Sequence, residues 1–106
     1  MKSLDFRRSD RLSDQIKSEI SFILKNESKD PRLEGLTILR VETSKDMKKA
    51  FIFFSPLNSF KQIDPKEVKE GLQNAKGFIR SSLGKRINIK HIPELFFQED
   101  DIQIIK

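Results

Sequence analysis

The stretch that decides the fold reads Asn74-Ala75-Lys76-Gly77-Phe78-Ile79-Arg80 and lies in the middle of a long helical pattern. A glycine inside a helix costs roughly 1 kcal/mol relative to alanine. Its presence therefore indicates either a kink or the close approach of a partner's backbone. The apolar pattern continues through Gly77, however, and one continuous helix fits it equally well.

The helix around this stretch has a clear predicted start and two separate surfaces. Asp64 is the expected N-cap, and Pro65 takes the first helical position. An apolar stripe covers about 80° of the helical wheel and consists of Val68, Leu72, Ala75, Ile79 and Leu83. The adjoining flank carries a basic stripe of Lys66, Lys69, Gln73, Lys76 and Arg80. Such a stripe is usually only the solvated face of a helix, but its segregation by sign also favours a polyanion-binding surface.

The chain before this helix predicts another helix and a β-hairpin. Apolar residues recur at helical spacing over Asp10–Asn26. Runs rich in β-forming residues follow at Leu36–Thr43 and Ala50–Phe54, and the short turn between them makes the pair antiparallel. Residues 56–63 are expected to form a loop.

The second run of the hairpin is apolar on both faces. Phe51 and Phe53 share the face opposite to Ala50, Ile52 and Phe54. Phenylalanines on a strand can stack nucleic acid bases. In a chain this small they more often cover the core or pack under a loop.

The chain after the long helix predicts a third strand. Gly84 suits the helix end. Ile87–Ile89 begins the strand, Pro93 interrupts it, and Leu95–Phe97 resumes it. Because proline lacks a backbone N–H, this strand is expected at the edge of the sheet.

The order of these elements predicts an α+β fold. A right-handed crossover through the long helix lays the third strand parallel to the second. The helices then cover one face of a three-stranded mixed sheet, which is the arrangement of a type II KH domain. The G-x-x-G loop with which KH domains clamp nucleic acid occurs nowhere in this chain.

Composition limits the chemistry that the chain can perform. It has 106 residues, 21 Lys+Arg against 16 Asp+Glu and a net charge of +5, which favours polyanion partners. There is no cysteine and one histidine, His91, so neither a metal site nor a cofactor is expected. No phosphate-binding loop or catalytic triad can be assembled, and we predict that the protein is not an enzyme. No apolar run could span a membrane, and a cytoplasmic location is expected.

Short motifs along almost the whole chain resemble the ribosome-binding factor A family, whose members assist assembly of the small ribosomal subunit in bacteria. The matching residues are, in chain order, Arg11-Leu12 with Ile16 and Ile20, Lys29–Arg32, Val41–Asp46 with Ala50 and Ser55, Leu72 with Ala75-Lys76-Gly77 and Ile79–Leu83, and Ile92–Phe97.

The resemblance implies a KH-like RNA-binding domain over residues 9–98, a basic N-terminal arm over 1–8 and a short C-terminal tail over 99–106. In such a domain Ala75-Lys76-Gly77 replaces the G-x-x-G loop within a helix-kink-helix. The resemblance further implies binding of the small (30S) subunit and its 16S ribosomal RNA during late maturation, often linked to growth in the cold. Assembly GTPases are implied as further partners, and a monomer is expected. The tail is short, which leaves open any role of a C-terminal extension.

Pattern and resemblance together give a set of candidate RNA-binding residues: Lys66, Lys69, Ala75, Lys76, Gly77, Arg80, Lys85 and Arg86. A second patch is expected at Arg7, Arg8 and Arg11. Two alternatives remain at this stage. One is a generic KH-like protein that binds single-stranded RNA, and the other is a protein-docking module that uses Phe51 and Phe53.

Overall fold

The computed structural model describes residues 4–55 and 64–100. Its elements, in chain order, are α1 (Leu4–Asn26), the 3-10 helix η1 (Pro31–Leu33), β1 (Thr37–Thr43), β2 (Lys49–Ser55), α2 (Pro65–Arg86) and β3 (Glu94–Glu99). The predicted loop at 56–63 and the end of the predicted tail lie outside the described residues.

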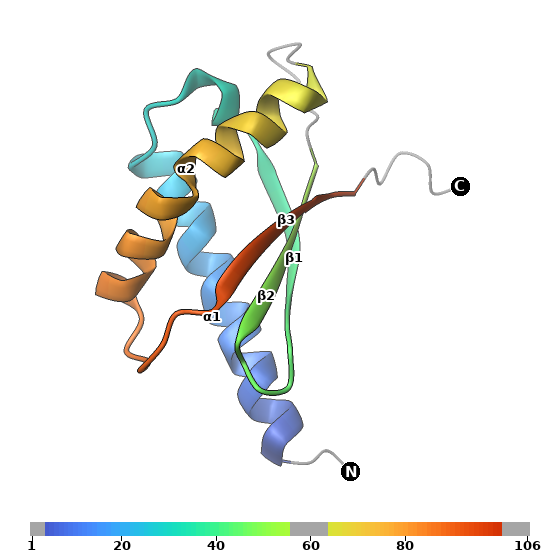
Figure 1. The fold of residues 1–106 in the computed structure, drawn as a ribbon, viewed down its shortest axis with the longest axis vertical. Coiled ribbons are helices and arrows are strands. Elements are labelled where there is room, and N and C mark those ends of the chain that lie inside the picture. The colour runs from blue at the N-terminus through green and yellow to red at the C-terminus, as the bar shows by residue number, and fades with distance from the viewer. Residues whose placement is uncertain (1–3, 56–63, 101–106) are drawn as a thin grey trace.

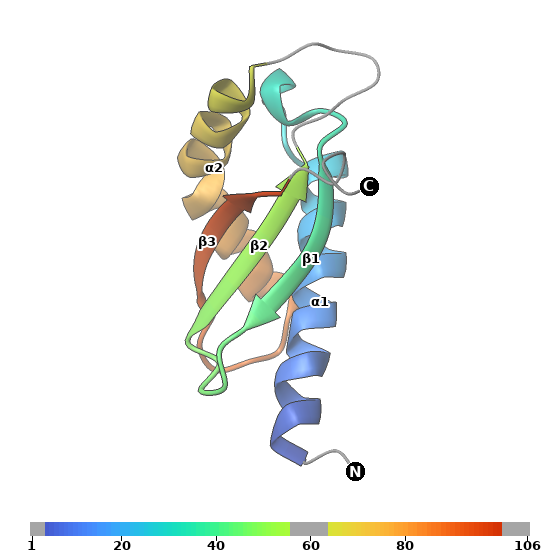
Figure 2. The same ribbon diagram turned by 90° about the vertical axis from the view of Figure 1, so that its right-hand side faces the viewer.

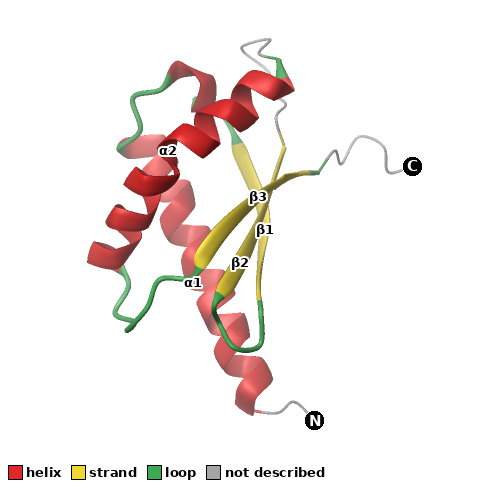
Figure 3. Cartoon of the chain, viewed as in Figure 1, coloured by secondary structure: helices red, strands yellow, loops and turns green. Residues whose placement is uncertain are grey.

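The three strands form one mixed sheet in the order β1-β2-β3. β1 and β2 pair antiparallel, and β3 lies parallel to β2 at the edge. Figure 2 looks onto the open face of this sheet, with both helices behind it. Figure 3 shows the same separation of red helices from yellow strands. The predicted α+β, type II KH-like topology is thereby confirmed.

The core lies between the sheet and the two helices. α1 contributes its predicted apolar stripe, in which Ile16, Ile20 and Ile23 are fully buried. In β2 alternate side chains point inward, so Ile52 and Phe54 are fully buried while Phe51 and Phe53 are half-buried. The core is completed from α2 by Val68, Leu72, Ile79 and Leu83.

The first helix begins at Leu4, six residues before its predicted start at Asp10. Arg7 and Arg8 therefore lie in the first turns of α1. The early start extends α1 past the β1–β2 turn at the lower end of Figure 1.

The long helix α2 is a single uninterrupted helix from Pro65 to Arg86. Its predicted N-cap is confirmed, because the Asp64 carboxylate accepts a hydrogen bond from the backbone N–H of Lys66 at 2.9 Å. The kink expected near Gly77 does not divide the helix, although its ribbon curves gently in both Figure 1 and Figure 2. The predicted end at Gly84 is wrong, because the helix continues for two more residues.

The third strand is shorter than predicted. It begins at Glu94, directly after Pro93, and Ile87–Ile89 is not part of it. The backbone N–H of Glu94 donates to the carbonyl oxygen of Lys48 at 2.9 Å, which is the first hydrogen bond beside β2. Pro93 cannot donate such a bond, so it marks the end of a connecting segment rather than an interruption within a strand.

Candidate nucleic-acid interface

A groove of about 750 Å³ lies where α1, the β1–β2 turn and the segment before β3 meet, and we call it the α1 groove. Four basic side chains line it: Arg8, Arg11, Lys48 and Lys90. Four apolar side chains also line it: Leu12, Met47, Ile89 and Ile92. The groove therefore combines positive charge with an apolar surface.

A smaller groove of about 450 Å³ adjoins it on α2, and we call it the α2 groove. Gly77, Arg80 and Ser81 contribute to it from the helix. Lys90, His91 and Ile92 line both grooves. The segment before β3 thus connects the predicted patch on α1 with the middle of α2.

The β1–β2 turn that forms one wall of the α1 groove is fixed by its own hydrogen bonds. The Asp46 carboxylate accepts from the Ser44 hydroxyl at 2.6 Å and from the backbone N–H of Lys48 at 3.0 Å. These two bonds, the hydroxyl first, hold the pKa of Asp46 below its usual value. Met47 adopts a left-handed backbone with φ 61°, a tight-turn conformation that orients the side chains on either side of it.

The opposite wall, α1, is tied to the end of β1 by two hydroxyl groups. The Thr43 hydroxyl donates to the carbonyl oxygen of Ser9 at 2.9 Å, and the backbone N–H of Thr43 donates to the Ser13 hydroxyl at 3.2 Å. The two hydroxyls are also within hydrogen-bond distance of each other, at 3.0 Å. The first half of α1 is therefore held beside the hairpin, which sets the width of the groove.

No carboxylate of the described residues neutralises the basic side chains of the α1 groove. Within residues 8–55 and 64–100, no carboxylate forms an ion pair with Arg8, Arg11, Lys48 or Lys90. All four residues are exposed. They are therefore available to an anionic ligand.

Two of the predicted RNA-binding arginines have partners inside the fold. Arg80 donates from its guanidinium to the carbonyl oxygens of Ile92 at 2.9 Å and Pro93 at 3.4 Å. Arg86 pairs with Glu19 of α1 and with Glu27, the residue directly after α1, and its guanidinium lies 4.1 Å from the centre of the Phe22 ring. Arg80 thus shapes the segment that lines both grooves, and Arg86 joins the two helices.

The other predicted residues of α2 are spread along the helix. Lys66, Lys69 and Lys85 are exposed, and the ammonium group of Lys76 lies 5.7 Å from the centre of the Phe96 ring. A Cβ added at Gly77 would meet no atom within 4 Å outside its own helix. At 1.5 Å per residue, Lys66 is about 21 Å from Arg80 along the axis, so the basic stripe does not gather at one groove.

Among the groove residues that sequence reasoning missed are the other two cations, Lys48 and Lys90, and the imidazole of His91. Each lies in an irregular segment, where no periodicity marks a surface. Pro93 was the available signal, because it indicates that the residues directly before it belong to a loop rather than a strand.

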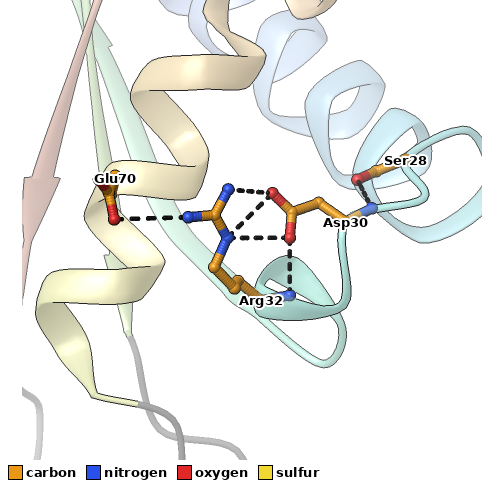
Figure 4. A network of polar contacts seen from close by, with 4 residues as sticks. All are labelled: Ser28, Asp30, Arg32 and Glu70. Atoms are coloured by element: carbon orange, nitrogen blue, oxygen red, sulfur yellow. Dashed lines mark hydrogen bonds and ion pairs between the residues drawn. The ribbon is translucent and has the colours of Figure 1, made fainter.

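The loop before β1 forms a polar network against α2, seen in Figure 4. Asp30 accepts from the Arg32 guanidinium at 2.8 and 3.0 Å and from its backbone N–H at 2.9 Å. The side-chain hydrogen bond from Arg32 is the main cause that lowers the pKa of Asp30. Glu70 on α2 lies 3.5 Å from the same guanidinium. A Cβ at Gly71 would come within 3.2 Å of Asp30 and Leu33. The absence of a side chain at Gly71 therefore allows the loop to pack closely against α2.

Phe51 and Phe53 of β2 lie on the open face of the sheet and are half-buried. Phe51 stacks on Phe96 of β3, with ring centres 5.3 Å apart. The Arg40 guanidinium lies 3.8 Å from the centre of the Phe53 ring and is held by Glu42 and Asp100. The rings are thus partly covered by one another and by Arg40.

The described residues form neither a cluster of metal ligands nor a membrane-spanning helix. In residues 8–55 and 64–100 no three His, Asp or Glu side chains come together as metal ligands would. Neither α1 nor α2 combines the length and the apolar character that a membrane-spanning helix needs.

Comparison with known proteins places the chain in a family. A family model described as ribosome-binding factor A matches residues 8–103. Ribosome-binding factor A of Thioalkalivibrio sulfidiphilus is 42% identical over 99 residues, which cover 93% of this chain and 75% of that protein.

Solved structures show the same fold. The crystal structure of ribosome-binding factor A from Thermus thermophilus matches with a TM-score of 0.74 at 22% identity, over 86% of this chain and 94% of that one. Coordinates of the Thermus thermophilus factor, fitted as a homology model into a cryo-electron microscopy map of a 30S complex, match with a TM-score of 0.59 at 23% identity, over 86% and 89%. Because the sequence match covers almost all of the chain, the protein belongs to the ribosome-binding factor A family.

Proposed function

We propose that this protein binds the small (30S) ribosomal subunit through its 16S ribosomal RNA and assists late maturation of the subunit without catalysing a reaction. The observation that carries the proposal is the family match over residues 8–103. A structural relative fitted into a map of a 30S complex supports the same partner. Action as a monomer in the cytoplasm, alongside assembly GTPases, completes the proposal.

The two grooves give this function a physical basis. Arg8, Arg11, Lys48 and Lys90 line the α1 groove without an ion-pair partner among the described residues. They replace counterions on RNA phosphates, and the release of those counterions drives binding. Further phosphate contacts are proposed along α2, at Lys66, Lys69, Lys76 and Lys85. Because phosphate contacts carry little sequence information, recognition rests on the shape of the folded RNA.

The uninterrupted helix favours structured ribosomal RNA over the single strand that a typical KH loop clamps. A G-x-x-G loop presents free backbone N–H groups to the nucleic acid. In an α-helix interior those groups are bonded to carbonyls four residues earlier. Ala75-Lys76-Gly77 lies inside α2, so it offers side chains and a smooth surface instead of a backbone clamp.

Co-sedimentation with precursor 30S subunits tests the proposal. The variant Arg11→Glu/Lys90→Glu places two repulsive charges in the α1 groove and should weaken association at least about tenfold. The matched control Lys17→Glu changes an exposed lysine of α1 that lines neither groove, and it should bind almost as the wild type does. Undiminished association of the folded double variant would remove the α1 groove from the subunit interface.

A further inference from the structure

The α1 groove has a property that phosphate binding does not require. Beneath its basic rim, Met47, Ile89 and Ile92 are half-buried against the hydrophobic core and still line the groove. Leu12 adds a buried apolar side chain. Contact with an apolar surface does not stabilise a bound phosphate. An aromatic base, in contrast, binds more favourably there because its apolar faces are removed from water.

The size of the groove fits one nucleotide. Its volume of about 750 Å³ falls within the range of roughly 300–1,000 Å³ that is common for small-molecule sites. Such sites combine an apolar surface with polar groups that fix orientation, and the α1 groove likewise combines four apolar side chains with charged ones. His91 adds a planar ring to the lining, and proteins stack unpaired bases on rings of this type.

The rim supplies the charge that a nucleotide needs. Arg8, Arg11, Lys48 and Lys90 surround the apolar surface and have no ion-pair partner in the part of the chain that the structure describes. The one carboxylate in the lining, Asp46, is hydrogen-bonded within its own turn. Phosphates on both sides of an inserted base would therefore meet cations.

The groove is also held open by the fold before any ligand arrives. Hydrogen bonds that the Asp46 carboxylate accepts fix the turn on one side, and the bond from the Thr43 hydroxyl to the Ser9 carbonyl fixes α1 on the other. A preformed site avoids the cost of ordering its walls during binding.

From this combination of apolar floor, basic rim and fixed walls we infer that the α1 groove receives one unpaired base of an RNA strand, with the flanking phosphates on the rim. The inference rests on the proposed function and specifies its ligand. It adds a base-sized contact to an interface otherwise described by phosphates alone.

The test compares two ligands that differ only in their bases. One is a single-stranded RNA hexamer, and the other is an abasic hexamer with the same number of phosphates. Stacking of one base in an apolar site should make the RNA hexamer bind about tenfold more tightly, measured by competition with a labelled strand. Equal affinities would show a groove that binds phosphate only and would overturn the inference.

Two variants locate the base within the protein. The chain contains no tryptophan, so Gln15→Trp places a single fluorescent reporter at the exposed edge of the α1 groove. Its emission should be quenched by the RNA hexamer and far less by the abasic strand. Ile89→Trp should fill the groove and abolish the preference between ligands. A preference that persists in a folded Ile89→Trp variant, with no quenching of the Gln15→Trp reporter, would place the base elsewhere and overturn the inference.

A matched control separates base binding from charge. Lys48→Ala removes one rim cation and should weaken binding of both hexamers by a similar factor, because both carry the same phosphates. If the two hexamers bind equally while the protein still co-sediments with precursor subunits, the inferred base contact is wrong and the proposed function stands. Failure of co-sedimentation with an intact base preference would instead contradict the proposed function, so the two outcomes are distinguishable.

Discussion

At the scale of single residues, the basic side chains fall into two groups: those that contact other groups of the protein and those that form no ion pair within the described residues. Arg80 and Arg86 were both predicted as RNA contacts, yet their guanidinium groups are held by Ile92 and Glu19. Those partners lie 12 and 67 residues away in the chain, beyond the reach of any local pattern. Lys48 and Lys90, which have no ion-pair partner among the described residues, lie in irregular segments where no periodicity marks a surface. For Lys90 the one signal was Pro93, which indicates a loop directly before it.

Two glycines of α2 give opposite predictions for the same substitution. Gly77→Ala should raise the free energy of unfolding by about 0.5–1 kcal/mol, because alanine is the better helix former and the new Cβ meets open space. Gly71→Ala should lower it by about 1 kcal/mol, because its Cβ would press on Asp30 and Leu33 at 3.2 Å. Urea denaturation of the two variants measures both effects.

The same two variants also distinguish an effect on stability from an effect on RNA binding. If RNA approaches α2 closely at Gly77, the alanine variant should be more stable and yet associate more weakly with precursor subunits. Equal stabilisation by both substitutions would show that the loop gives way at Gly71, and the proposed role of that glycine would then be wrong.

At the scale of elements, the sequence predicted the identity of each element better than its ends. α2 passes the expected stop at Gly84, and its last residue Arg86 pairs with Glu19 of α1 and with Glu27 directly after α1. Rules for helix ends take no account of such long-range ion pairs. The last strand starts late because residues before Pro93 leave the sheet to line the grooves. Both errors come from tertiary contacts that override local preference.

The loop that packs on α2 should respond to acid. Hydrogen bonds from Arg32 hold the pKa of Asp30 below its ordinary value of 3.8, so the ionised carboxylate stabilises the fold. This stabilisation is complete above about pH 5 and is lost as the pH falls through the lowered pKa. Asp30→Asn should therefore cost about 1 kcal/mol at pH 7, and its difference from the wild type should shrink between pH 4 and pH 2.

Urea midpoints measured across this pH range provide the test. Asp14→Asn serves as the control, because Asp14 is an exposed carboxylate of α1 without a partner in the described residues. Its stability should follow the wild type at every pH. A constant gap between Asp30→Asn and the wild type would mean that the Arg32 contact does not stabilise the folded state.

At the scale of the whole molecule, topology could be predicted and the site could not. The order of elements and the right-handed crossover rule sufficed for the sheet, which the pairing of β2 with β3 confirms. The α1 groove, in contrast, is assembled from residues 8–15, 46–48 and 89–92. These three segments come together only in the folded chain. The sequence therefore did not reveal which basic residues line one groove.

The salt dependence of subunit binding should show whether the cations of the α1 groove contact RNA phosphates. Each RNA phosphate contact contributes a slope of roughly −0.7 to −0.9 in the plot of log K against log salt concentration. Lys48→Ala/Lys90→Ala removes two rim cations and should make the slope shallower by about 1.5. Filter binding of precursor subunits at several potassium concentrations measures the change.

A control of equal charge decides whether position or total charge matters. Lys17→Ala/Lys45→Ala also removes two exposed lysines, so both variants have 19 basic residues against 16 acidic ones and a net charge of +3 instead of +5. Neither lysine lines a groove. If the α1 groove contacts phosphate directly, only the first variant changes the slope. If the protein is attracted merely as a basic body, both variants lose affinity alike, since long-range attraction depends on net charge.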